Sequence, residues 1–494
     1  MKGTLVVTAL MITSALDGAP RLVPLPDKSP LVTMRVVLLT GAAQEPAGQE
    51  GVAALCAAML AQGGTRTLSY KQIVDAMFPM ATSVDYQVDK EMVTFSGVTH
   101  VDNLEKYYAL FRAMLLEPGW RQDDFDRLRD DAVNFLRVTL RGNNDEELSK
   151  EVLYNALYQG HPYGYHSIGV ISSIQNLTLD NLRDFYKSQF TQANLILGVA
   201  GGYPKSFPER LKKDFAALPQ GTKSERRLPD PKPLSGNRLV IVEKDTRSVA
   251  YSFGFPIEVT RGHPDYVALL VAQSYLGQHR SSAGRLYERM RQQRGLNYGD
   301  YAYIEYFPRG MFRMMPDPNL ARPQQIFQVW IRPVEPDTAH FGLRLAMYEL
   351  NKFVAQGMSQ EDFERIRSFL SKYVNLLIKT KDAELGYAID SLYYGIPEYN
   401  GFIKKGLSQL TLENVNRAIR KHLRAERIQF VAVARNAQEL RGKILSNQPS
   451  PMKYNSEKPG DLLAEDAVIQ ELKLDFKPEN VVVVPVDRIF EARE

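Results

Sequence analysis

Two stretches of this sequence occur twice, about half a chain apart. QDDFDRLR at 122–129 reappears as QEDFERIR at 360–367, an offset of 238 residues. LTLDN at 177–181 reappears as LTLEN at 410–414, an offset of 233. Each LTL motif begins a helix pattern at a threonine N-cap, and an apolar strand pattern follows each helix. The same order at nearly the same spacing predicts one structural unit that is present twice.

Each unit mixes strand patterns with amphipathic helix patterns. In the first unit, residues 31–40 predict a strand, 51–62 a helix and 82–99 a hairpin. In the second, 238–244 and 248–255 predict strands that precede a helix. Antiparallel strands with helices on one face are typical of α+β proteins. We therefore predict an α+β fold of two homologous α/β-sandwich domains joined by a linker.

The domain boundaries follow from composition. Residues 219–237, PQGTKSERRLPDPKPLSGN, are rich in proline, glycine and charge and predict the linker. This assigns 17–218 to the N-terminal domain and 238–445 to the C-terminal domain. Residues 446–494 form a tail with a helix pattern and the apolar run VVVVPV. Such a run is too apolar for a free strand edge, so we expect the tail to pack on a domain.

The N-terminus fits two interpretations. In residues 1–16, one lysine precedes a mostly apolar run, and small residues follow at Gly18 and Ala19. This pattern is typical of a short secretory signal peptide, which predicts a periplasmic or secreted protein. The same residues fit a first β-strand, in which case a cytoplasmic location is expected. Elsewhere, no run approaches the roughly 20 apolar residues of a membrane-spanning helix.

Composition argues against two classes of function. The net charge of +4 is mild, and no basic stripe is interleaved with aromatic residues, so nucleic-acid binding is not expected. The single cysteine, Cys56, cannot form a disulfide within the chain. No histidine lies near it in the sequence, so we interpret it as a small buried hydrophobic residue and not as a catalytic thiol.

The helix predicted at Gly51–Leu60, GVAALCAAML, is unusually rich in alanine. It follows a strand pattern and a polar turn, and Gly63 and Gly64 end it. In this arrangement of strand, turn and helix, the chain resembles the pitrilysin/insulinase-type zinc metallopeptidase family over nearly its whole length. The resemblance implies a two-domain α+β fold.

The resemblance also implies the position of a zinc motif, H-x-x-E-H, in which two histidines bind the metal and the glutamate activates a water. The motif positions are Ala54, Ala57 and Ala58 in this sequence. A third ligand, a glutamate on the long helix of the same domain, would fall at Phe135 or Leu136. None of these side chains coordinates zinc. We therefore expect no metal and no cofactor in this chain.

The histidines elsewhere in the sequence do not form an obvious alternative metal site. Of the seven, only His161 and His166, in HPYGYH, lie close together in the sequence. They flank a proline and a glycine, which predicts a turn with a structural role.

The segment at 284–298, GRLYERMRQQRGLNY, carries a second resemblance. Family members carry an R-x6-Y pair on the second domain that reaches the bound peptide beside the zinc. Arg291 and Tyr298 match that spacing within similar surroundings. An isolated pair of this kind would indicate an arginine on a solvated helix face and a tyrosine at the start of a strand. With the flanking match, we predict that both residues bind substrate, as donors to a peptide carbonyl or a developing oxyanion.

Some bacterial members of this family work as pairs, in which one subunit carries the zinc motif and the other the arginine–tyrosine pair. The resemblance therefore implies a non-catalytic, peptide-binding subunit of a heterodimeric zinc peptidase, inactive alone. Its partners would be a homologous zinc-bearing subunit and a peptide substrate, and the zinc would lie in the partner. Two alternatives remain open: a structural or assembly scaffold of the same fold without a proteolytic role, and a stand-alone peptide-binding protein.

Overall fold

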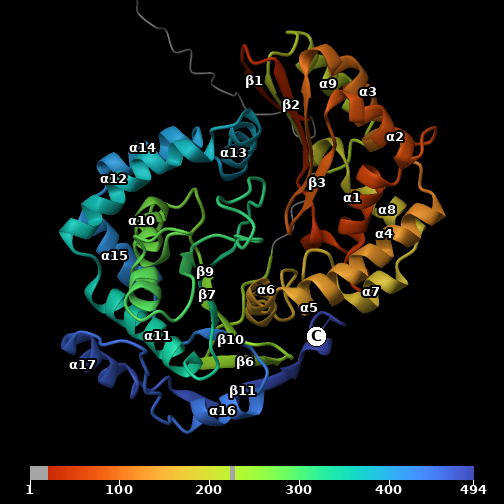
Figure 1. The fold of residues 1–494 in the computed structure, drawn as a ribbon. Helices are drawn as coiled ribbons and strands as arrows, with labels where there is room; N and C mark the ends of the chain where they lie inside the picture. The colour runs from red at the N-terminus through yellow and green to blue at the C-terminus, as the bar shows by residue number, and fades with distance from the viewer. Residues whose placement is uncertain (1–19, 223–227, 494) are drawn as a thin grey trace, which may run out of the picture.

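A computed structural model describes residues 20–222 and 228–493 and confirms the α+β prediction. The first copy of the unit contains five strands, nine α-helices and the π-helical turn η4 (Figure 1). Their bounds are β1 Arg21–Pro26, β2 Leu31–Leu38, α1 Val52–Gln62, α2 Tyr70–Met77, β3 Asp85–Val88, β4 Val93–His100, α3 Leu104–Leu116, α4 Gln122–Asn134, η4 Phe135–Leu140, α5 Arg141–Asn143, α6 Asp145–Leu157, α7 Ile171–Asn176, α8 Leu179–Gln189, β5 Leu195–Gly201 and α9 Phe207–Phe215.

The second copy contains the remaining elements, coloured green to blue in Figure 1. Their bounds are β6 Asn237–Glu243, β7 Val249–Ile257, α10 Tyr266–Gly277, the π-helical turn η6 Tyr287–Gln292, β8 Asp300–Tyr303, β9 Gln325–Val334, α11 Ala339–Gln356, α12 Gln360–Leu377, α13 Lys381–Tyr394, α14 Tyr399–Gln409, α15 Leu412–His422, β10 Gln429–Ala434, α16 Ala437–Leu445, α17 Gly460–Ile469 and β11 Phe476–Pro485.

The two sheets repeat one topology. The first has the strand order β1-β5-β2-β4-β3, and the second has β11-β6-β10-β7-β9-β8. Without β11, the orders correspond strand for strand. The pairs β1–β5 and β6–β10 are parallel, and all other pairs are antiparallel. The helices that follow the two LTL motifs begin at the predicted N-caps. Thr178 accepts a hydrogen bond from Asn181 N, and Thr411 accepts one from Asn414 N. The duplication read from the sequence is therefore present in the fold.

The two copies exchange one helix each. α6 of the first copy packs on β7, β10 and β9 of the second, and α13 of the second packs on β5, β2 and β1 of the first. In Figure 1, α13 accordingly lies beside the first sheet and α6 beside the second. The offset of 238 residues places Asp145, the first residue of α6, within α13, so the exchanged helices are equivalent. Each sheet thus completes its core with a helix from the other copy.

The first strand lies outside the segment where the sequence suggested one. β1 spans Arg21–Pro26, whereas residues 1–16, assigned to a signal peptide or a strand, fall outside the described residues. Pro24 and Pro26 interrupt the strand pattern, because proline has no N–H for a sheet ladder. They are tolerated because β1 is an edge strand, paired with β5 alone.

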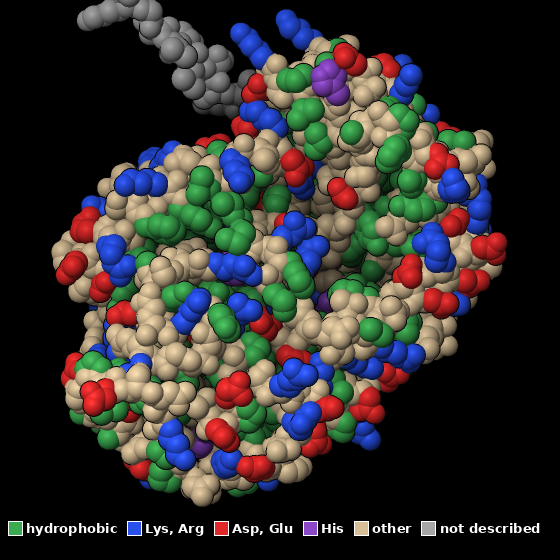
Figure 2. All heavy atoms as spheres, in the orientation of Figure 1, with side chains coloured by type: hydrophobic (Ala, Val, Ile, Leu, Met, Phe, Trp, Pro, Cys, Tyr) green, Lys and Arg blue, Asp and Glu red, His purple; other side chains and the backbone are tan. Residues whose placement is uncertain are grey.

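The hairpin connections differ most between the copies. Four residues, 89–92, join β3 to β4, whereas 21 residues, 304–324, join β8 to β9. This β8–β9 loop reaches the first copy: Gln87 Nε2 donates to the carbonyl of Pro318 at 3.0 Å, and Tyr306 Oη donates to Glu151 Oε1 at 2.7 Å. Figure 2 shows a recess between the two copies, which form the two lobes of the molecule, on this face.

The C-terminal residues contact both copies. β11 adds a parallel strand beside β6. Beyond it, the carbonyl of Phe490 accepts from Ile171 N at 3.0 Å, and Arg493 forms an ion pair with Glu50 at 2.9 Å. Within 20–222 and 228–493, no helix has the length and apolar composition needed to cross a bilayer.

Candidate functional site

Helix α1 carries the positions of the expected zinc motif. Ala54, Ala57 and Ala58 are 8%, 0% and 4% exposed. The helix contacts β3 and β4 on one side and α3, α4 and α8 on others, so it is surrounded by the first core. Alanine allows these close contacts because its side chain is a single methyl group. A zinc site requires nitrogen, oxygen or sulfur donors, and these three side chains supply none.

The positions of the expected third ligand are apolar as well. Phe135 begins η4, and its ring centroid lies 5.7 Å from that of His166. Leu136 is fully buried in the core. The residues present therefore do not fit a zinc ion at this place, and no step of zinc chemistry can be assigned to it.

One buried carboxylate does lie at the start of α1, but it caps the helix. Glu45 accepts hydrogen bonds from Gly51 N at 3.0 Å, Ala53 N at 2.9 Å and Tyr165 Oη at 2.9 Å. Burial raises the pKa of Glu45 to about 7, although the three donors act in the opposite direction. Its oxygens satisfy the free N–H groups of the first helical turn. Sequence analysis did not identify this residue.

His161 and His166 lie in a turn, as predicted. Residues 160–168 contain no helix or strand. Tyr163 N donates to His161 Nδ1 at 2.9 Å, and Ile168 N donates to His166 Nδ1 at 3.1 Å. Both imidazoles therefore use one ring nitrogen to hold the turn.

The structure also forms a histidine cluster that the sequence did not indicate. Ligand-type atoms of His263, Asp265 and His422 lie within 4.8 Å of one another. Partial burial acts to raise the pKa of Asp265, but hydrogen bonds from His422 and Lys421 hold it at about 2. The carboxylate is already neutralised by cationic side chains, with Arg417 also 3.6 Å away. These charges oppose a divalent cation, so we interpret the cluster as an ion-pair network.

The structure brings Arg291 and Tyr298 together. The guanidinium of Arg291 lies over the rings of Tyr287 and Tyr298, 5.1 and 5.2 Å from their centroids. It also donates to the carbonyl oxygen of Tyr298 at 3.2 Å. Tyr298 is 71% exposed, so its hydroxyl is accessible at the surface. Both side chains can donate hydrogen bonds to a molecule that binds there.

Comparisons with known proteins agree with this architecture. The family model described as insulinase (peptidase family M16) matches residues 24–169, and the model described as the peptidase M16 inactive domain matches residues 176–370. An uncharacterized zinc protease of Rickettsia bellii is 22% identical over 400 residues, which cover 78% of this chain and 89% of the relative. The non-peptidase homolog YmxG of Helicobacter pylori is 21% identical over 416 residues, which cover 82% and 89%.

Solved structures share the fold. The crystal structure of a peptidase M16 inactive domain from Pseudomonas fluorescens has a TM-score of 0.73 to this chain at 21% sequence identity. The similarity covers 84% of this chain and 95% of that one. At this identity the comparison concerns the arrangement of the two domains and not the chemistry of a site.

Proposed function

The chain belongs to the M16 insulinase family, with its N-terminal domain and its inactive C-terminal domain, and we propose that it is a non-catalytic, peptide-binding subunit of a heterodimeric zinc peptidase. The absence of every zinc donor at Ala54, Ala57, Ala58 and Phe135 is the observation that carries the proposal. A relative of similar length is named a non-peptidase homolog, which supports the same function.

The contribution of this chain to catalysis would come from Arg291 and Tyr298. A zinc peptidase develops negative charge on the carbonyl oxygen that is attacked, and preorganised donors at that oxygen lower the barrier. Tyr287 and Tyr298 enclose the guanidinium of Arg291, which limits its rotamer freedom before substrate arrives. The exposed Tyr298 is suited to reach across to a partner's active site.

The peptide itself would bind along an open strand edge. β3 is the last strand of the first sheet, and Asp85 and Tyr86 on it are exposed. α1, with its alanine positions, packs directly against β3. An extended peptide added beside β3 would gain main-chain hydrogen bonds. It would then run past the place that holds the metal in a catalytic member of the family.

Co-purification with a homologous zinc-bearing subunit tests this function. Each chain alone and their mixture are assayed for peptide hydrolysis, with and without a chelator. We expect hydrolysis only in the mixture. Arg291→Ala should lower turnover of the mixture by roughly 10²–10³, as expected for the loss of one oxyanion donor. Arg420→Ala, at an exposed position of α15, is the matched control and should leave turnover unchanged.

Two results would count against the proposal. Hydrolysis by this chain alone, abolished by the chelator, would show that it holds a catalytic metal of its own. Formation of the heterodimer with full activity of the Arg291→Ala mixture would instead favour a scaffold role.

A further inference from the structure

The second copy contains a cavity at the place that corresponds to the zinc-motif positions Ala54, Ala57 and Ala58 of the first copy. Val52, Ala53, Leu55 and Ala57 of α1 are matched by Val267, Ala268, Leu270 and Ala272 of α10, an offset of 215 residues. This offset places Gln273 at the position of Ala58, and the offset of 238 places Tyr373 at that of Phe135. Gln273 and Tyr373 both line a cavity of about 90 Å³.

The cavity is large enough for a ligand. A single ordered water needs about 15 Å³ on a comparable measure, so several waters or a small organic group can enter. Most of its wall is apolar or aromatic, with aliphatic side chains from α10, α12, α14 and the β8–β9 loop: Leu270, Ile304, Leu320, Leu370, Val374 and Ile403. Such a wall favours an apolar group over a charged one.

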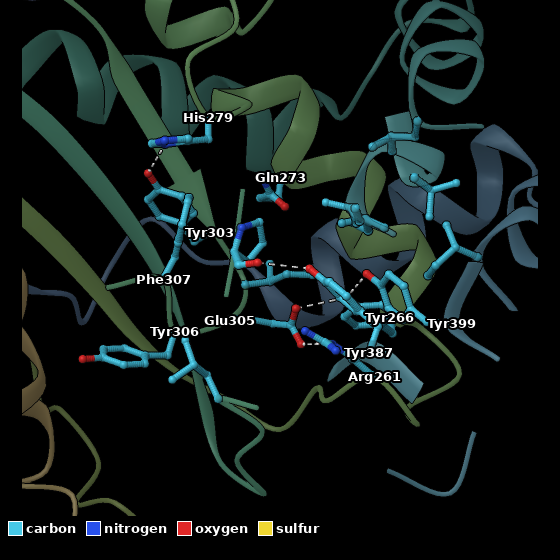
Figure 3. A pocket seen from close by; sticks show the side chains of 18 of the residues that line it. Arg261, Tyr266, Gln273, His279, Tyr303, Glu305, Tyr306, Phe307, Tyr387 and Tyr399 are labelled. Atoms are coloured by element: carbon cyan, nitrogen blue, oxygen red, sulfur yellow. Dashed lines mark hydrogen bonds and ion pairs between the residues drawn. The ribbon is translucent and has the colours of Figure 1, made fainter. Parts of the chain in front are cut away.

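Two carboxamides and the hydroxyl of Tyr373 are the polar groups of the cavity that no other described group engages. Gln273 and Gln278 are each 8% exposed and line it. Within the described ranges, no hydrogen bond reaches either side-chain amide. Figure 3 shows Gln273 directed toward the centre of the lining side chains. Since neither amide is engaged by another group of the described chain, both can pair with a ligand that enters the cavity.

The charged groups of the cavity are already engaged with one another. Arg261 Nε donates to Glu305 Oε1 at 2.9 Å, and Arg261 Nη1 donates to Asp390 Oδ2 at 3.1 Å. Tyr266 Oη donates to the other oxygen of Glu305 at 3.1 Å (Figure 3). His279 contacts Tyr303 Oη and the Arg313 carbonyl, and burial lowers its pKa to about 4. A charged ligand would therefore find no free counter-charge here.

We infer that this cavity binds an apolar residue of a peptide, with the side chain against the aliphatic wall and the backbone amide paired with the carboxamide of Gln273. A peptide group offers one donor and one acceptor, which matches the donor and acceptor of a primary carboxamide. The β8–β9 loop that forms one wall also exposes Phe312 and Met314, which are suited to contact the rest of such a chain.

Calorimetric titration of the purified full chain tests the inference. The probes are an acetylated and amidated pentapeptide with one phenylalanine among alanines, the all-alanine peptide, and capped single phenylalanine. We expect saturable binding of the phenylalanine peptide, at least tenfold weaker binding of the all-alanine peptide, and weaker binding of capped phenylalanine. The titration needs no partner subunit, so its result is independent of the heterodimer proposed above.

Two variants address the site directly. Gln273→Leu should weaken binding about tenfold, because leucine cannot pair with a peptide group, and it should not lower the unfolding temperature, because no hydrogen bond of the described chain is lost. Leu370→Trp should fill the cavity and abolish binding. Gln409→Leu, at an exposed position of α14, is the matched control and should bind as the wild type does.

The absence of saturable binding to the wild type would overturn the inference. So would unchanged affinity in Gln273→Leu and Leu370→Trp, since the peptide would then bind elsewhere.

Discussion

The guanidinium of Arg322, in the β8–β9 loop, meets the carboxylate of Asp89, in the β3–β4 turn, with 2.8 Å between Nε and Oδ2. Both side chains are 2% exposed. The ring centroid of Tyr306 lies 3.7 Å from the guanidinium carbon. The long hairpin loop of the second copy therefore buries a positive charge against the short hairpin turn of the first, and this pair connects the two lobes.

Removal of one partner of this buried ion pair should destabilise the folded protein. We expect Arg322→Ala to lower the free energy of unfolding by about 3–5 kcal/mol, because Asp89 is left as an uncompensated buried charge. Urea denaturation measures the change. Arg183→Ala, which breaks the surface pair with Asp180, should cost less than about 1 kcal/mol. Equal costs for the two variants would show that the Arg322–Asp89 pair does not stabilise the lobes.

The helix exchange predicts a steric requirement at Gly198 of β5. A Cβ atom there would lie 3.0 Å from Ile389 Cδ1 and 3.0 Å from Leu385 Cδ1, both on α13. We expect Gly198→Val to lower the free energy of unfolding by about 1–3 kcal/mol by overpacking, and Ile389→Ala to recover part of this loss. Gly442→Ala, where a Cβ meets nothing within 4 Å, should be neutral or stabilising. Failure of Ile389→Ala to compensate would contradict the packing of α13 on β5.

The buried imidazole of His279 predicts a pH dependence of stability. Burial lowers its pKa from an ordinary 6.5 to about 4, so the folded state favours the neutral ring. The preference for the neutral ring contributes about 3 kcal/mol to the free energy of unfolding. This stabilisation is fully present above pH 6.5 and is lost as the pH falls toward 4. Relative to His279→Gln, the wild type should therefore lose stability over this interval in denaturation curves. His100→Gln, at a more exposed position, controls for the loss of a histidine, and parallel curves for wild type and His279→Gln would contradict the prediction.

Restoring the four missing side chains should create a zinc site. We expect the variant Ala54→His, Ala57→Glu, Ala58→His and Phe135→Glu to retain about one zinc per chain, because two histidines four residues apart share a helix face. Without metal, the larger side chains overfill the core and should lower the unfolding temperature, which zinc should partly restore. Metal analysis and thermal unfolding measure both effects. The same variant without Ala58→His is the control, and a folded quadruple variant without zinc would show that α1 and η4 do not face one metal position.

Local patterns in the sequence predicted many elements within one or two residues, as the helix at 51–62, observed as α1 Val52–Gln62, illustrates. β1 was missed because its prolines resemble a loop pattern. The cavity beside Gln273 was missed because its wall combines α10, α12, α14 and the β8–β9 loop, which are separated in the sequence.

The identities of side chains at known helical positions are local information. The sequence alone therefore determined that the unit occurs twice and that Ala54, Ala57 and Ala58 offer no metal donor. Contacts between distant residues leave no local periodicity. Only the tertiary structure decided that α6 and α13 each pack on the sheet of the other copy, that Arg322 pairs with Asp89, and that His422 contacts Asp265, because each contact joins residues that are far apart in the sequence.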